Sequence, residues 1–179
     1  MQNSVIASAF ATLMLERLQD HQVLPQSVAC VGAFSASDAR TVQDALPDVA
    51  VSALSGFSDL GTQAVDCVWV NLELMHVFNW PTQLALAYQA LSPGGVLLGS
   101  VLTRECADDQ AFDWEPFALW PHLPDVFELG DLLQQGRWQD PVVDLECFSL
   151  QFEDSDNLLE ELGKARLLKE VPTPYSGGA

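Results

Sequence analysis

Positive charge is scarce in this sequence. Its 179 residues include 7 Lys and Arg against 25 Asp and Glu, which gives a formal net charge of −18. A protein that binds nucleic acid must neutralise phosphates with Lys and Arg, and this chain carries too few of them. The same charge disfavours binding to anionic membranes and to acidic proteins. The sequence therefore predicts neither a nucleic-acid partner nor a membrane partner.

Motifs for metal binding and nucleophilic catalysis are also missing. The four cysteines stand far apart and form no C-x-x-C pair: Cys30, Cys67, Cys106 and Cys147. The three histidines form no H-x-x-x-H pair: His21, His76 and His122. There is no G-x-S-x-G and no phosphate-binding loop. We therefore expect no metal site, thiols that behave as small buried apolar groups, and a location in the reducing cytoplasm.

A large apolar fraction is what the chain does contain. Hydrophobic residues make up 49% of the sequence and charged residues 18%, which predicts one well-packed domain. We assign this domain residues 1–170 and expect residues 171–179, with their Pro and Gly, to form a flexible tail. The apolar opening has no Lys or Arg before Arg17 and repeats with helical spacing. It predicts an amphipathic helix rather than a signal peptide or a membrane span.

Short apolar runs alternate with segments of helical spacing. Strands are expected at residues 28–31, 49–51, 65–70 and 96–102. Helices are expected at residues 6–18, 35–46, 81–91, 125–135 and 157–168. This succession predicts an α/β fold with a mostly parallel sheet covered by helices on both faces. Residues 142–152 alternate as one or two further strands would, which predicts an antiparallel edge near the C-terminus.

Two stretches resemble a known family. The run DCVWVNL from Asp66 is followed by a helical segment and by LSPGGVLL from Leu91, and an L-x-P-G-G turn before an apolar strand is typical of class I S-adenosylmethionine-dependent methyltransferases. The later runs FELGDLL from Phe127 and DPVVD from Asp140 are similar to the malonyl-acyl-carrier-protein O-methyltransferases of biotin synthesis and their relatives. The resemblance implies a Rossmann-like methyltransferase fold, S-adenosylmethionine as cofactor and a malonyl-carrier protein as substrate.

The cofactor motif departs from that family. Its first strand ends in an acid followed by glycines, D/E-x-G-x-G-x-G, and the glycines let the main chain approach the cofactor. Here the matching residues read CVGAFSA, so that Cys30 replaces the acid and Gly32 is the only glycine kept. Phe34 and Ala36 replace the second and third glycines. A phenyl ring at position 34 would lie where the cofactor has to pass.

Three further departures concern the same site. No carboxylate directly follows the second strand to hold the ribose, and Asp59, the nearest, suits a loop or capping role. About a dozen residues separate that strand from the next, so we expect the outer strand and its adenine-binding wall to be missing. The family's N-terminal lid is expected to be short. We therefore predict a degenerate, non-catalytic binding or accessory protein with no cofactor, the alternative being an active S-adenosylmethionine-dependent enzyme.

Candidate site residues follow from the resemblance. Gly32, Phe34 and Asn71 occupy positions that line the cofactor pocket in the family, and capping the loop is an equal interpretation for Asn71. His76 and His122 are the candidates for a catalytic base. A buried, hydrogen-bonded role is an alternative for His76, and His122 falls in a segment, residues 104–124, that we interpret as a long loop or broken helix.

Charge also bears on the partner. An acyl carrier protein is acidic, whereas the only cluster of basic residues, at positions 164, 166 and 169, is nearly neutralised by glutamates at 160, 161 and 170. An acidic carrier protein is therefore disfavoured. We expect a protein partner instead, with the aromatic segment from Phe112 to Trp120 as the contact. Core packing is the alternative role of that segment.

Overall fold

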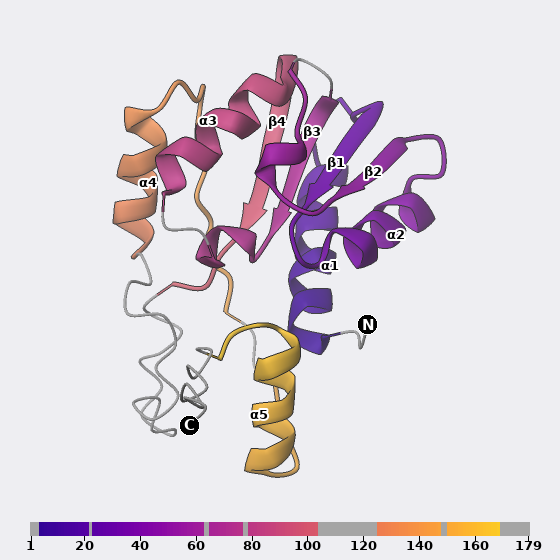
Figure 1. The fold of residues 1–179 in the computed structure, drawn as a ribbon, viewed down its shortest axis with the longest axis vertical. Coiled ribbons are helices and arrows are strands. Elements are labelled where there is room, and N and C mark those ends of the chain that lie inside the picture. The colour runs from indigo at the N-terminus through magenta and orange to yellow at the C-terminus, as the bar shows by residue number, and fades with distance from the viewer. Residues whose placement is uncertain are drawn as a thin grey trace, which may run out of the picture.

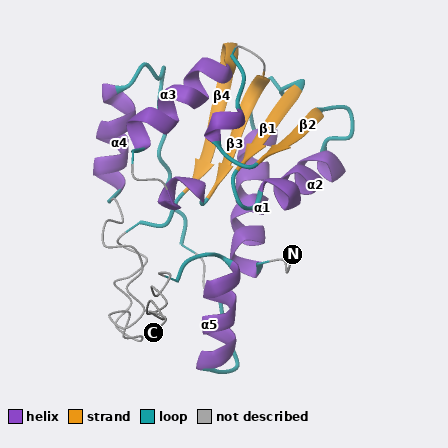
Figure 2. Cartoon of the chain, in the orientation of Figure 1, coloured by secondary structure: helices purple, strands orange, loops and turns teal. Residues whose placement is uncertain are grey.

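The computed structural model describes residues 4–21, 23–62, 65–76, 79–103, 125–147 and 150–168. Four strands form one sheet in the order β2-β1-β3-β4, and every neighbouring pair is parallel (Figures 1 and 2). The strands are β1 (Ser27–Val31), β2 (Ala50–Leu54), β3 (Val65–Asn71) and β4 (Leu91–Ser100). The predicted parallel sheet is therefore confirmed.

Helices cover both faces of this sheet. On one face α1 (Val5–Gln19) and α2 (Ser35–Ala45) pack in a core cluster with side chains such as Cys30, Cys67 and Trp69. On the other face α3 (Trp80–Ala90) packs against Val31, Val68 and Val70. Cys67 and Trp69 of β3 thus belong to one core and Val68 and Val70 to the other, as the alternation of a strand requires. α4 (Val126–Gln135) adds Leu132 and Leu133 to the second core.

Local signals explain where the helices begin. The Ser4 side chain accepts from the Ala7 N–H at the start of α1, and Pro81 lies in the first turn of α3. Asp125 and Glu128 form a reciprocal capping box at α4. The Asp154 side chain accepts from Asn157 N at the start of α5 (Ser155–Lys164). The Ser4, Asp125 and Asp154 side chains accept from main-chain N–H groups that a helix leaves free, and Pro81 has no N–H that would need a partner.

The outer strand is absent from the described part of the chain, as predicted. Between β2 and β3 the described residues form only a short 3-10 helix, η1 (Phe57–Asp59), instead of a helix and a strand. β2 is therefore an edge of the described sheet.

Two details differ from the expectations. β4 begins at Leu91, which pairs with Val65, while Val96 pairs with Cys67, so the expected turn at 92–95 is a bulge within the strand. The antiparallel edge expected at 142–152 is not formed by residues 142–147 and 150–152, which run as coil. In that coil Asp144 and Glu146 pair with Arg17 of α1. The predicted loop at 104–124 and tail at 171–179 lie outside the described residues.

None of the helices in the described ranges is both long and apolar enough to span a bilayer.

Candidate functional site

The carboxyl edge of the sheet is where a ligand would bind in a fold of this class, because the loops after parallel strands meet there. In this protein the edge faces α5 and the first turn of α1 (Figure 1). Three segments build its described part: the turn from β1 to α2, the 3-10 helix η2 (Glu73–His76) after β3, and residues 101–103 after β4.

The turn after β1 is built around Gly32. Its φ of 105° lies in the left-handed region that side chains disfavour, and its N–H donates to the Leu54 carbonyl at 2.9 Å. Phe34 follows as the N-cap residue of α2. The left-handed conformation of this turn thus falls on the one glycine of the motif that the sequence keeps.

Glu73 occupies the space beside this turn. Its Oε2 accepts from the Ala33 N–H at 3.0 Å, and a Cβ placed on Gly32 would collide with the Glu73 carboxylate. Arg166 Nη1 lies 4.0 Å from the same oxygen, and the Glu73 side chain is only 13% exposed. A carboxylate of the chain itself therefore holds the main-chain N–H that a ligand approaching Gly32 would meet.

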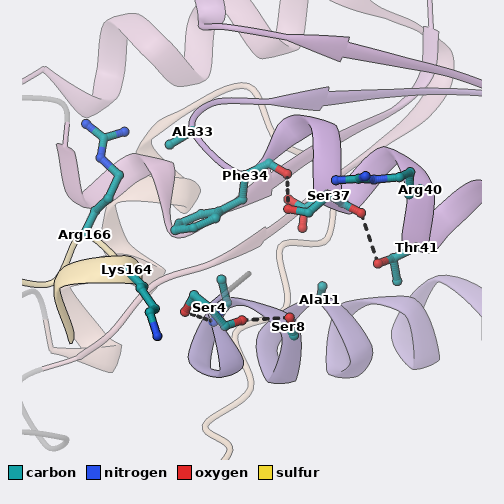
Figure 3. A pocket seen from close by; sticks show the side chains of 12 residues that line it. Ser4, Ser8, Ala11, Ala33, Phe34, Ser37, Arg40, Thr41, Lys164 and Arg166 are labelled. Atoms are coloured by element: carbon teal, nitrogen blue, oxygen red, sulfur yellow. Dashed lines mark hydrogen bonds between the residues drawn. The ribbon is translucent and has the colours of Figure 1, made fainter. Parts of the chain in front are cut away.

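Phe34 fills the neighbouring space. It packs against a third apolar cluster, and in Figure 3 its ring points toward the end of α5, where Lys164 and Arg166 lie. The cluster joins residues that follow β3, the start of α1 and the end of α5. Its buried members are Ile6, Ala7, Leu72, Met75, Leu162, Ala165 and Leu167. The carboxyl edge is thus covered by the protein's own side chains.

Asn71, the third cofactor-pocket candidate, is 1% exposed, and its side chain is hydrogen-bonded to three other elements. Its Nδ2 donates to the Ala7 carbonyl at 2.9 Å and to Asp38 Oδ1 at 3.0 Å, and its Oδ1 accepts from Ser100 Oγ at 2.9 Å. Both amide hydrogens and the amide oxygen are used inside the protein, an arrangement that positions α1 and α2 on the sheet.

Asp38 is a buried acid that the sequence did not single out. It is 2% exposed, and burial raises its pKa to about 6, although hydrogen bonding from Asn71 and from the Trp69 indole opposes the rise. The Asn71 hydrogen bond to Asp38 Oδ1 is 3.0 Å long, whereas neither Asp38 Oδ2 nor Trp69 Nε1 has a hydrogen-bond partner of normal geometry. The Trp69 contact is therefore weaker than the Asn71 contact. A single acid in the first turn of a helix gives no signal that it will be buried.

The catalytic candidates are placed as follows. His76 is the last residue of η2. Burial lowers the pKa of its imidazole to about 4, and the positive charge of Arg166 is a second cause. The imidazole is therefore neutral at physiological pH. His122 lies outside the described residues.

Cys30 stands at the position of the missing acid. Burial, and to a lesser extent the charge of Asp38, raises the pKa of its thiol. Burial also raises the pKa of the Cys67 thiol, to about 12. Neither thiol is ionised at neutral pH, so neither is an activated nucleophile.

One cavity of about 240 Å³ lies next to the Phe34 turn, between α1, α2 and the end of α5 (Figure 3). Its rim carries Arg40, Lys164 and Arg166, and Asp38 is among its lining residues. Its volume is below the roughly 300–1,000 Å³ of common ligand pockets. Within the part of the chain that the structure describes, no three His, Cys, Asp or Glu residues are grouped as a metal site would require.

Comparisons with known proteins extend this description. The chain is 31% identical over 120 residues to the malonyl-acyl-carrier-protein O-methyltransferase of Xylella fastidiosa, a match that covers 64% of this chain and 41% of that protein. It is 24% identical over 181 residues to malonyl-acyl-carrier-protein O-methyltransferase 1 of Coxiella burnetii, covering 88% and 63%. The chain thus spans less than two thirds of the length of these relatives. No family model matches it.

Solved structures resemble the fold. A chain from the complex between the Haloferax volcanii Trm112 methyltransferase activator and a methyltransferase superposes with a TM-score of 0.50 at 14% identity, over 90% of this chain and 93% of that chain. An S-adenosylmethionine-dependent methyltransferase from Thermotoga maritima gives 0.49 at 18% identity, over 73% and 72%. The resemblance to class I methyltransferases and the Rossmann-like α/β fold are confirmed.

Proposed function

We propose that this chain is a methyltransferase-like protein that does not bind S-adenosylmethionine in the usual mode and acts as a non-catalytic binding or accessory protein. The observation that carries the proposal is the filling of the β1–α2 turn by Glu73 and Phe34. A cofactor laid along this turn would have to displace a hydrogen-bonded carboxylate and a packed ring.

The ribose contact supports the same proposal. β2 ends at Leu54, and the nearest acid beyond it, Asp59, accepts a 2.7 Å hydrogen bond from Ser55 Oγ within the loop. Asp59 is the one carboxylate in the described β2–η1 segment, and it lies in the loop, five residues beyond the end of the strand, where it bonds within the loop. The outer strand, which would supply the adenine wall, is also absent from the described sheet.

The alternative is an active S-adenosylmethionine-dependent methyltransferase of the malonyl-carrier-protein type. The names of the Xylella and Coxiella relatives favour it. The net charge of −18 weighs against an acidic carrier as substrate, because like charges repel during encounter. Growth without biotin of a strain that lacks its own malonyl-carrier-protein methyltransferase, restored by this chain, would establish the alternative.

A protein partner is part of the proposal. The Haloferax volcanii neighbour was solved with an activator protein, which supports a partner-dependent role for this fold. The aromatic segment from Phe112 to Trp120, our predicted contact, lies outside the described residues and stays a prediction, as does the cytoplasmic location.

Isothermal titration with S-adenosylmethionine tests the proposal. We expect no binding heat up to about 1 mM cofactor, because three separate contacts are missing. The Xylella relative, titrated in the same buffer, is the positive control. A dissociation constant in the micromolar range for this chain would overturn the proposal.

A further inference from the structure

The open edge of β2 is a surface that the proposed function does not use. Ala50 N donates to Gln26 O, and Gly32 N donates to Leu54 O, at 2.8 and 2.9 Å. Since every second residue of a parallel strand bonds to the same neighbour, Ala50, Ser52 and Leu54 face β1. The N–H and C=O groups of Val51 and Ala53 therefore point away from β1, and in the described part of the chain no strand lies beyond β2 (Figures 1 and 2).

This edge lacks the features that normally prevent strand pairing. Natural edges are protected by lysine, proline, bulges or a covering element. β2 has none of these: its sequence is AVSAL, and its five residues pair with β1 in unbroken register. Ala50, Ser52 and Ala53 are small and exposed, so a second backbone could approach closely.

The charge around the edge selects the occupant. Between Arg40 and Arg104 the chain contains no Lys or Arg at all, whereas exposed Asp48 and Asp59 flank β2 before and after it. A second copy of this chain would bring acids against acids. A basic segment would be attracted instead.

We propose that the free edge of β2 is a docking site for an extended segment of a partner protein that carries Lys or Arg at its ends. The segment adds a fifth strand through the outward groups of Val51 and Ala53, and its basic ends lie near Asp48 and Asp59. Main-chain hydrogen bonds of this kind give affinity with little demand on the side chains of the added strand.

The probe is the acetylated and amidated peptide Lys-Val-Thr-Val-Thr-Val-Lys, titrated into the isotopically labelled full chain. We expect saturable amide shifts centred on residues 50–54, with the largest changes at Val51 and Ala53. The same peptide with its central amides N-methylated should give no shifts, since it cannot donate to the edge. A peptide with Glu in place of both Lys should bind at least fivefold more weakly.

The matched protein variants are Ala53→Pro and Ala53→Val. Proline removes an outward N–H that β1 does not use, and it should weaken binding at least tenfold, whereas valine keeps the N–H and should bind like the wild type. Unchanged amide signals outside β2 check that the proline variant folds. If it does not fold, the N-methylated peptide decides.

Three results would overturn the proposal. These are no binding of the peptide up to 1 mM, shifts that map away from β2, and self-association of the chain through residues 50–54 in sedimentation, which would make a second copy the occupant. The site does not depend on the cofactor turn. Cofactor binding that refuted the proposed function would leave this edge and its test unaffected.

Discussion

Two titratable side chains, the buried Asp38 and the half-buried His76, change the free energy of unfolding in opposite directions as the pH falls. The pKa of Asp38 is raised from 3.8 to about 6 and that of His76 is lowered from 6.5 to about 4. Asp38 therefore contributes stability below pH 3.8 that is lost as the pH rises through 6. His76 contributes stability above pH 6.5 that is lost as the pH falls through 4. Between pH 4 and 6 the two effects largely oppose one another.

Asp38→Asn should remove the first effect. The Asn71 hydrogen bond to Oδ1 can still form, and no charge is buried at neutral pH. As the pH rises from 4 to 7, the wild type should lose up to about 3 kcal/mol of unfolding free energy through Asp38, and the variant should not show this loss. Urea unfolding at both pH values measures the difference. An equal pH slope in the two proteins would contradict the raised pKa.

His76→Gln should remove the second effect. Because the folded wild type resists protonation at this position, it should lose about 2 kcal/mol more than the variant between pH 6.5 and pH 4.5. The same urea series checks this, with His21→Gln as the control, since His21 is exposed. A wild type and an H76Q variant that lose equal stability would show that His76 is protonated freely.

Phe34→Gly combined with Cys30→Asp and Glu73→Ala would restore the acid and the second glycine of the family's motif and remove the neighbouring carboxylate. We expect cofactor binding to remain weaker than about 1 mM, since the ribose and adenine contacts are still absent. The Phe34→Gly change alone should lower the free energy of unfolding by about 2–3 kcal/mol, because the ring packs in the third cluster. Titration and urea unfolding measure these outcomes. Micromolar binding would show that the turn was the only defect.

At the scale of residues, the sequence predicted the unusual composition of the β1–α2 turn but not the side chains that contact it. The aberrant Phe34, the surviving Gly32 and the missing ribose acid follow from a local motif. Glu73 reaches the turn from 40 positions away, and Asp38 meets Asn71 across 33 positions. Such contacts are set by how helices dock on the sheet, and no local pattern reports them.

At the scale of elements, Glu161 ties α5 to α1. Its Oε1 accepts from Ser4 Oγ at 2.7 Å and from Ile6 N at 3.0 Å, so a residue of α5 supplies a cap to the first turn of α1. Glu161 is 5% exposed, and Leu162 beside it belongs to the third cluster. These hydrogen bonds thus fix α5, and with it the third cluster, against the carboxyl edge of the sheet.

Glu161→Ala should destabilise the chain by about 2–3 kcal/mol, because it leaves a buried hydroxyl and a main-chain N–H without their acceptor. Glu161→Gln keeps an acceptor oxygen and should cost about half as much. Urea unfolding gives the free energies, and hydrogen exchange at Ile6 and Ala7 shows whether the first turn of α1 opens. Equal protection of these amides in all three proteins would exclude the capping role.

Most elements were predictable because each strand is a short, largely apolar run between turn residues, and α1, α3, α4 and α5 each begin at a residue whose side chain caps the first turn. The expected strand at 142–152 shows the limit. Alternation of apolar and polar residues places side chains on two sides, yet a strand also needs a neighbouring edge with which to pair. In this fold Asp144 and Glu146 are drawn to Arg17 instead, and exposed Val142 contacts no core.

At the scale of the whole molecule, the charge of −18 destabilises the compact state through self-repulsion. Raising NaCl from 10 to 200 mM should therefore raise the melting temperature by a few degrees, since the Debye length falls from about 30 to about 7 Å. Thermal unfolding followed by circular dichroism measures the shift, and equal concentrations of sucrose serve as a non-ionic control. A melting temperature that falls with salt would mean that attractive ion pairs dominate.

The stretch without Lys or Arg also governs how this protein can be detected. Trypsin cleaves after basic residues, so complete digestion leaves everything from Thr41 to Arg104 as a single peptide that contains β2, β3, α3 and β4. Routine mass spectrometry of tryptic digests would miss most of the sheet. A protease that cuts at acidic residues, such as Asp44, Asp48, Asp59 and Asp66, would recover it.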